Sequence, residues 1–180
     1  MLKDRTSLDT RTIALIAILT AVTIVFTLAV RIPFAPTRGY FTLADVGVYF
    51  AAFAFGPLVG FIVGGLGTGL ADILGGYAHF AIWSFLIHGF QGLVAGYLGA
   101  RRGWFGLIAG WLAGAVVMVA GYFLVELALY GFGPAAGEAT TVNLPQVLIG
   151  GLLAIGLLIA VRRAYPQIDV FAQPRTWREG

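Results

Sequence analysis

The sequence predicts an all-α integral membrane protein, a compact bundle of six transmembrane helices with both termini in the cytoplasm. Composition is the first reason, since 59% of the 180 residues are hydrophobic, 11% are charged, and the mean hydropathy is +0.92. Soluble domains are about 45–50% apolar and about 25% charged. The other two reasons are the lengths of the apolar segments and the placement of basic residues between them.

Six apolar segments define the expected helices. They span about residues 11–30, 43–56, 57–75, 79–100, 104–131 and 142–163. Most approach the roughly 20 residues that a spanning helix needs. The second is shorter and is expected to be a half-span, a tilted helix or part of a broken one, whereas the long fifth segment should tilt or protrude. The chain is expected to form a single membrane domain over residues 1–180, with residues 164–180 as a cytoplasmic tail.

The first segment also has the layout of a signal peptide, because Lys3, Arg5 and Arg11 precede its apolar run. That run is too long for a typical signal core, and no Ala-x-Ala cleavage site follows it. We therefore expect the segment to be retained as a helix.

Basic residues set the orientation of the bundle. With six crossings, both termini and the joints near residues 56 and 101 lie on one face. Assigning that face to the cytoplasm leaves only Arg31 and Arg38, of 11 Lys and Arg, outside, as the positive-inside rule favours. The cytoplasmic set is Lys3, Arg5, Arg11, Arg101, Arg102, Arg162, Arg163, Arg175 and Arg178. The net charge of +3 then reflects membrane topology, and nucleic acid is not expected as a partner.

The three carboxylates within the spans all lie in the outer half of the bundle in this orientation. Asp45 begins the second helix, Asp72 ends the third, and Glu126 lies near the outer end of the fifth. Asn143 and Gln146 begin the sixth. Polar groups in lipid face protein or a water-filled cavity. The sequence therefore predicts an outward-facing pocket with polar walls and an apolar floor.

Aromatic residues follow the same distribution. Tyr40 lies in the first outer loop, and Trp83 lies near the start of the fourth helix. Tyr122, Glu126 and Tyr130 are spaced i, i+4, i+8 and form one stripe on a helix. Arg38 is a loop donor within reach of the outer carboxylates. The candidate ligand-binding residues are Arg38, Tyr40, Asp72, Trp83, Tyr122, Glu126, Tyr130, Asn143 and Gln146.

A purely structural interpretation stays open for several of these residues. Tyr and Trp at helix ends commonly form an interfacial belt. Asp45 and Asp72 can order helix ends, and Asn143 and Gln146 can cap the sixth helix around Pro145.

The fourth helix presents two different polar faces. His79 and His88 are nine positions apart and point to opposite sides, so they cannot chelate one metal ion, and no metal site is expected. Trp83 lies close to the His79 side, whereas Gln91 shares the side of His88. We favour Trp83 as the pocket residue and expect His88 and Gln91 to form interhelical hydrogen bonds.

Glycines recur at every fourth position of the third helix, at Gly56, Gly60 and Gly64, and again at Gly65 and Gly69. Such rows let neighbouring helices approach closely. A close-packed wall is therefore expected beside the pocket. The fourth helix carries a matching set, Gly89, Gly92 and Gly96.

Residues 39–99 resemble a known family. The run contains Leu43-x-Asp45, then Gly56-Pro57, a glycine-rich helix, Ala71-Asp72 and Gly76-Tyr77. This pattern is similar to the S component of energy-coupling factor (ECF) vitamin transporters, near the riboflavin and pyridoxine or hydroxymethylpyrimidine branches. The resemblance implies capture of a vitamin at the outer face of a prokaryotic plasma membrane, without a cofactor. It also implies a transmembrane coupling subunit and two cytoplasmic ATPase subunits as partners.

Two sequence features agree with that implication. A phosphate-binding loop needs a lysine after its glycines, and the chain has only Lys3, so ATP must be hydrolysed elsewhere or transport is passive. Relatives carry an Ala-x-x-x-Ala face on the first helix that meets the coupling subunit. Ala17 and Ala21 match this motif, and Ala14 extends it. One departure is that His88 and Gln91 stand where many relatives have a lysine and an acidic residue.

The substrate stays open between riboflavin, a pyridoxine-like vitamin and a hydroxymethylpyrimidine. Outer loops over residues 31–42 and 132–141 are expected to close over it. A stand-alone passive carrier or channel is one alternative function, and an intramembrane enzyme is another. The only serines, Ser7 and Ser84, lack a Gly-x-Ser-x-Gly context, which leaves Asp72 and Glu126 as a conceivable acid/base pair.

Overall fold

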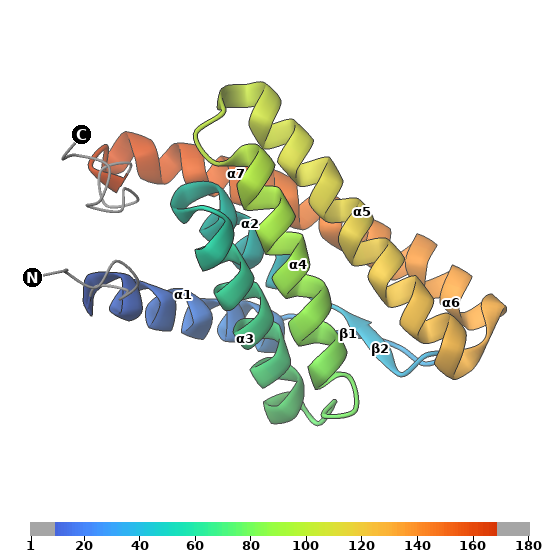
Figure 1. Cartoon of the computed structure of the whole chain (residues 1–180). Coiled ribbons are helices and arrows are strands. Elements are labelled where there is room, and N and C mark those ends of the chain that lie inside the picture. Colours follow the sequence, from blue (N-terminus) through green and yellow to red (C-terminus); the bar gives the residue numbers. More distant parts are fainter. Residues whose placement is uncertain (1–9, 169–180) are drawn as a thin grey trace, which may run out of the picture.

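The computed structural model describes residues 10–168, which form a bundle of helices and one short hairpin (Figure 1). Lys3, Arg5, Arg175, Arg178 and the part of the predicted tail after residue 168 lie outside the described residues. The helices are α1 (Thr10–Ala29), α2 (Ala44–Phe55), α3 (Pro57–Gly75), α4 (Ala81–Gly99), α5 (Gly103–Tyr130), α6 (Phe132–Glu138), the π-helix η1 (Ala139–Asn143) and α7 (Leu144–Ala164). The strands are β1 (Ile32–Phe34) and β2 (Gly39–Phe41).

Among the described residues, five helical stretches are long and apolar enough to cross a membrane. They are α1, α3, α4, α5 and the continuous stretch Phe132–Ala164. Helix α2 has 12 residues and is too short to be one of them. The six-crossing count and the cytoplasmic placement of both termini therefore stay predictions.

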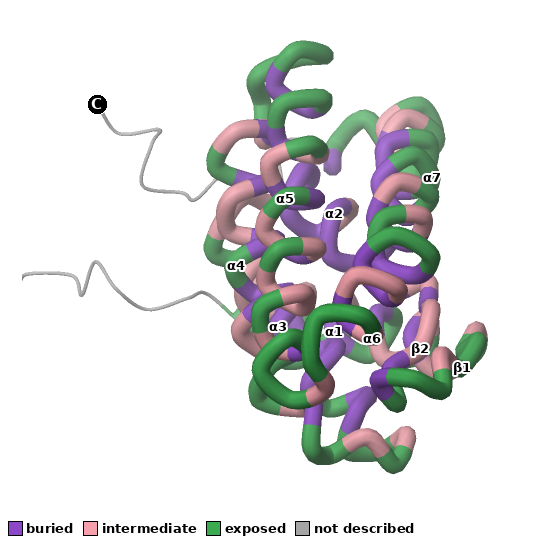
Figure 2. Tube along the Cα trace, turned by 90° about the vertical axis from the view of Figure 1, so that its right-hand side faces the viewer, coloured by how far each residue is buried: buried purple, intermediate pink, exposed green. Residues whose placement is uncertain are grey.

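Helix α2 is short because it runs inside the bundle. Nearly every residue from Ala44 to Ala54 is buried, and Figure 2 shows this helix as an almost unbroken buried segment. Its Tyr49 and Phe53 stack at 5.5 Å between ring centroids. They pack with Met118 of α5 and Leu158 of α7 in the largest hydrophobic cluster. An apolar helix of this length is typical of a buried core element.

The two segments expected to be outer loops are both ordered into regular structure. Residues 32–41 form an antiparallel hairpin in which Pro33 is opposite Tyr40. Residues 132–141, expected to be a loop, instead form α6 and most of η1. That expectation is wrong because Pro134 sits in the first helical turn, where no backbone donor is lost. The hydroxyl of Thr141 also donates to the Gly137 carbonyl at 2.7 Å, within the helix.

The predicted glycine wall is confirmed between α3 and α4, which lie side by side in Figure 1. A Cβ on Gly92 would overlap the backbone carbonyl of Gly60. A Cβ on Gly64 would likewise overlap the carbonyl of His88, and one on Gly96 would lie 2.7 Å from the Cα of Pro57. The backbones of α3 and α4 are therefore in direct contact over several turns.

Helix α1 contacts the bundle through a row of threonines. Its buried residues are Ile16, Thr20, Thr23 and Thr27, and Thr23 packs against Gly47 of α2 and Gly67 of α3. The Thr23 hydroxyl donates to the Leu19 carbonyl at 2.9 Å, so its polarity is satisfied within the helix. The alanine face is on the other side. Ala14, Ala17 and Ala21 are exposed in the isolated chain.

Candidate functional site

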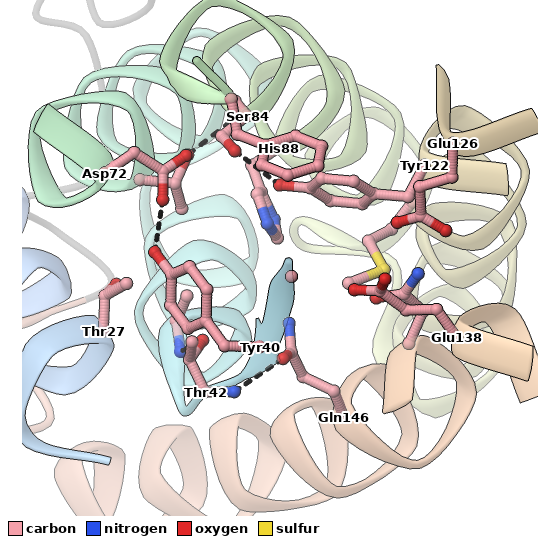
Figure 3. Close-up of a pocket in the computed structure, with 16 residues that line it drawn as sticks. Thr27, Tyr40, Thr42, Asp72, Ser84, His88, Tyr122, Glu126, Glu138 and Gln146 are labelled. Atoms are coloured by element: carbon pink, nitrogen blue, oxygen red, sulfur yellow. Dashed lines mark hydrogen bonds between the residues drawn. The ribbon is translucent and has the colours of Figure 1, made fainter. Parts of the chain in front are cut away.

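A polar pocket lies at the end of the bundle that carries the hairpin and α6 (Figure 3). It encloses a small cavity of about 40 Å³ that opens to solvent. The lining residues come from all the elements except β1: Thr27, Gly39, Tyr40, Thr42, Ala44, Thr68, Asp72, Phe80, Ser84, His88, Met118, Tyr122, Glu126, Glu138, Asn143 and Gln146.

One wall of the pocket consists of hydroxyl groups around Asp72. The Tyr40 hydroxyl, on the hairpin, donates to Asp72 Oδ1 at the end of α3. Ser84 Oγ and the Tyr122 hydroxyl lie 2.6 Å apart and join α4 to α5. Burial raises the pKa of the Tyr40 hydroxyl, and the nearby Asp72 carboxylate raises it further. Tyr40 therefore stays protonated at neutral pH and can donate to Asp72.

A second network, which includes the lining residues Thr42, His88 and Gln146, is centred on Asp45 of α2. Its two oxygens accept hydrogen bonds from Gln91 Nε2 at 2.5 Å and Gln146 Nε2 at 2.8 Å. Gln146 Oε1 in turn accepts from the Thr42 backbone N–H at 2.6 Å, and His88 Nδ1 lies 2.7 Å from Gln91 Oε1. The network ties α2 to α4 and α7. The expected interhelical role of Gln91 is thereby confirmed, and Asp45 has the structural role that the sequence left open.

The opposite wall is acidic. Glu126 of α5 and Glu138 of α6 are both buried, and Figure 3 shows both side chains pointing into the pocket. Glu138 accepts a hydrogen bond from the Thr37 hydroxyl, in the turn of the hairpin. Both carboxylate oxygens of Glu126 and the amide Nδ2 of Asn143 lack a hydrogen bond of regular geometry among the described residues, although Asn143 and Glu138 lie close enough to interact with Glu126. These unpartnered groups are available to a ligand.

Six of the nine predicted site residues line the pocket: Tyr40, Asp72, Tyr122, Glu126, Asn143 and Gln146. Arg38 is exposed in the hairpin turn and has a φ of 58°. Tyr130 lies beyond the pocket, with its ring centroid 6.4 Å from that of Phe80. Trp83 is 40% exposed and does not line the pocket. The chosen face of the fourth helix is therefore wrong, since α4 turns Ser84 and His88 inward instead.

Sequence reasoning missed several lining residues. Glu138 was not predicted because its segment was expected to be a loop. Thr42 and Thr68 were not predicted because they are uncharged and do not stand out in an apolar sequence. Thr27 had a usable signal. Thr20, Thr23 and Thr27 share one face at helical spacing, which would have predicted the buried side of α1.

Comparison with known proteins decides the family. The family model described as "ECF-type riboflavin transporter, S component" matches residues 7–163. The chain belongs to this family. It is a membrane transporter component that binds substrate, and it is not an enzyme.

Similar proteins include two with close sequences. This S component is 37% identical over 143 residues to the "Thiamine precursor transporter HmpT" of Lactococcus lactis subsp. cremoris (strain MG1363), covering 79% of this chain and 82% of that one. It is 36% identical over 134 residues to an uncharacterized protein of Pyrococcus woesei, covering 74% and 89% of the two chains.

One solved structure shows the same fold. The crystal structure of FolT bound with folic acid matches with a TM-score of 0.53 and 23% sequence identity. The match covers 92% of this S component and 97% of that chain. At this identity the likeness concerns the fold alone.

Proposed function

We propose that this S component captures a small heterocyclic vitamin or vitamin precursor at the outer face of a prokaryotic plasma membrane. The observation that carries the proposal is the polar pocket, which joins two tyrosines to acidic and amide side chains within a family of vitamin transporters. Aromatic rings offer flat contact area, and the polar groups fix the orientation of a ring edge. The ligand contacts proposed are those of the six lining residues predicted from sequence, together with Ser84 and Glu138.

The substrate proposed is a single-ring heterocycle of the hydroxymethylpyrimidine type. The relative at 37% identity is a thiamine precursor transporter, and the enclosed cavity is small, at about 40 Å³, which favours a single ring over a larger flavin. Riboflavin is the second candidate, because the matching family model carries its name.

Mass spectrometry of the molecule that co-purifies with the chain expressed alone tests this proposal. We expect a stoichiometric, colourless pyrimidine, and nanomolar binding of 4-amino-5-hydroxymethyl-2-methylpyrimidine in a panel with riboflavin, pyridoxine and folic acid. A yellow preparation with a flavin spectrum would instead establish the second candidate. An empty protein that binds no member of the panel would contradict vitamin capture.

Uptake is proposed to depend on ATP hydrolysed by an ECF module, a transmembrane coupling subunit with two cytoplasmic ATPase subunits. The exposed alanine face of α1, formed by Ala14, Ala17 and Ala21, is the proposed contact with the coupling subunit. ATP-independent flux through vesicles that contain this chain alone would favour the passive-carrier alternative.

The proposed topology has six crossings, with α2 as the short sixth element and both termini inside. The chain has no cysteine, so single cysteines can be placed without background. We expect a membrane-impermeant maleimide to label Ala35→Cys, in the hairpin turn, in intact cells. Arg163→Cys, at the end of α7, should be labelled only after the membrane is opened. Labelling of both sites from the same side would contradict the topology.

A further inference from the structure

The acidic wall of the pocket brings together two carboxylates from different elements. Glu126 is fully buried in α5, and Glu138 is 3% exposed at the end of α6. The two side chains interact electrostatically and reach into the same part of the pocket, as Figure 3 shows. Among residues 10–168, no arginine or lysine forms an ion pair with either of them. Two neighbouring ionised carboxylates repel each other, so the pair is stabilised either by a proton shared between the two groups or by donors that lie between them.

The donors supplied by the protein satisfy only part of this pair. Glu138 Oε2 accepts from the Thr37 hydroxyl, whereas neither oxygen of Glu126 has a partner in the described structure. A buried acceptor without a partner costs about 1–3 kcal/mol, and more when it is charged. A ligand that brings N–H donors to Glu126 would remove that cost.

The pair is also held in position by its surroundings. A Cβ on Gly39 would overlap the Glu138 carboxylate, so this carboxylate lies directly against the backbone of the hairpin. Thr37, two residues earlier in the same hairpin, bonds to Glu138. Glu138 is therefore held against the hairpin, and Glu126 faces it without a hydrogen bond of regular geometry, close to Glu138 and Asn143.

We propose that Glu126 and Glu138 are a specificity-determining pair that binds the exocyclic amino group of an aminopyrimidine, one N–H to each carboxylate. The proposal rests on the proposed function and names the ligand group that this wall selects. Carboxylates accept hydrogen bonds, so the pair favours a ring edge that carries an NH₂ group. It disfavours a ring edge that carries carbonyl oxygens, such as the imide edge of a flavin. The unpartnered Nδ2 of Asn143 can donate to a ring nitrogen next to the amino group.

Binding of two matched pyrimidines to the purified full chain tests the pair. The probes are 4-amino-5-hydroxymethyl-2-methylpyrimidine and its 4-oxo counterpart, which differ only in replacement of the amino group by oxygen and a ring N–H. We expect the wild type to bind the amino compound about 100-fold or more tightly than the oxo compound, because a site built around a hydrogen bond rejects the analogue that lacks it. Equal affinity for the two probes would overturn the proposal.

Variants separate recognition from a structural role. Glu126→Gln and Glu138→Gln each keep the side-chain shape but add an amide donor, which suits the 4-oxo group. We expect each to lower the amino-to-oxo preference by about tenfold or more. If the two residues had only a structural role, each variant would bind both probes more weakly by the same factor. An unchanged amino-to-oxo preference would therefore overturn the proposal. Tyr130→Phe, one turn beyond Glu126 and outside the pocket, is the control and should keep the wild-type preference.

The outcomes also distinguish this inference from the function on which it rests. A wild type that binds riboflavin at nanomolar concentration and ignores both pyrimidines overturns the acidic-pair proposal but leaves vitamin capture standing. A wild type that binds no vitamin at all overturns both.

Discussion

Replacement of Gly92 by alanine is expected to lower the thermal unfolding temperature of the purified protein by about 2–12 °C. A Cβ at this position would overlap the Gly60 carbonyl and lie 3.1 Å from the Gly60 Cα, so relief requires α3 and α4 to move apart. Overpacking of this kind costs about 1–3 kcal/mol or somewhat more. For a chain of this size, each kcal/mol corresponds to about 2–4 °C. Intrinsic tryptophan fluorescence of the protein in detergent measures the transition.

Gly156→Ala is the matched control. This glycine lies in α7, and a Cβ there would meet no atom within 4 Å. Alanine is the better helix former by about 0.5–1 kcal/mol, so this variant should be as stable as the wild type or slightly more stable. Equal transitions for the two variants would show that the glycine wall is not a close backbone contact.

Ala17→Trp is expected to reduce vitamin uptake by cells that express the whole transporter by about tenfold or more, while binding to the purified chain stays unchanged. Ala17 is exposed on α1 and points away from the threonine row that packs on the bundle. A close helix–helix contact through small residues does not accommodate an indole ring. Radiolabelled substrate measures uptake, and calorimetry measures binding.

The control for this prediction is Leu152→Trp. Leu152 is 59% exposed on α7. A tryptophan at this position also faces outward, but it lies on a different helix from the alanine face of α1. We expect normal uptake from this variant. Normal uptake from Ala17→Trp would mean that the coupling subunit binds elsewhere, whereas loss of uptake by both variants would mean that bulk alone impairs the protein.

The sequence predicted those features that depend on composition and spacing. The apolar segments, the clustering of polar residues towards one end of the bundle and the glycine rows can each be recognised from one helix at a time. Helical spacing correctly separated Trp83 from His88, but it gave no information about which side of α4 turns inward. That choice depends on the contact of Gly60 with Gly92, which sets the rotation of α4 against α3.

Residues 131–138 show a different failure. Gly131, Gly133, Pro134 and Gly137 are typical of a loop, and local propensity favours one. Tertiary contacts reverse that preference, because Ala135 and Glu138 are buried and Thr37 of the hairpin bonds to Glu138. Neither the hairpin partner nor the burial is visible in the segment itself, and so the second carboxylate of the pocket was not predicted.

The direct contact of α3 with α4 limits how such a protein can change its specificity over evolutionary time. At positions where one backbone touches another, any side chain destabilises the protein, so mutation there lowers stability without reshaping the pocket. Variation that reshapes the pocket without this penalty falls on the lining side chains outside these contacts, including those of the hairpin, α5, α6 and α7. Descendants of this chain that acquire new substrates should therefore keep Gly60 and Gly92 and differ at Glu126, Glu138 and Asn143.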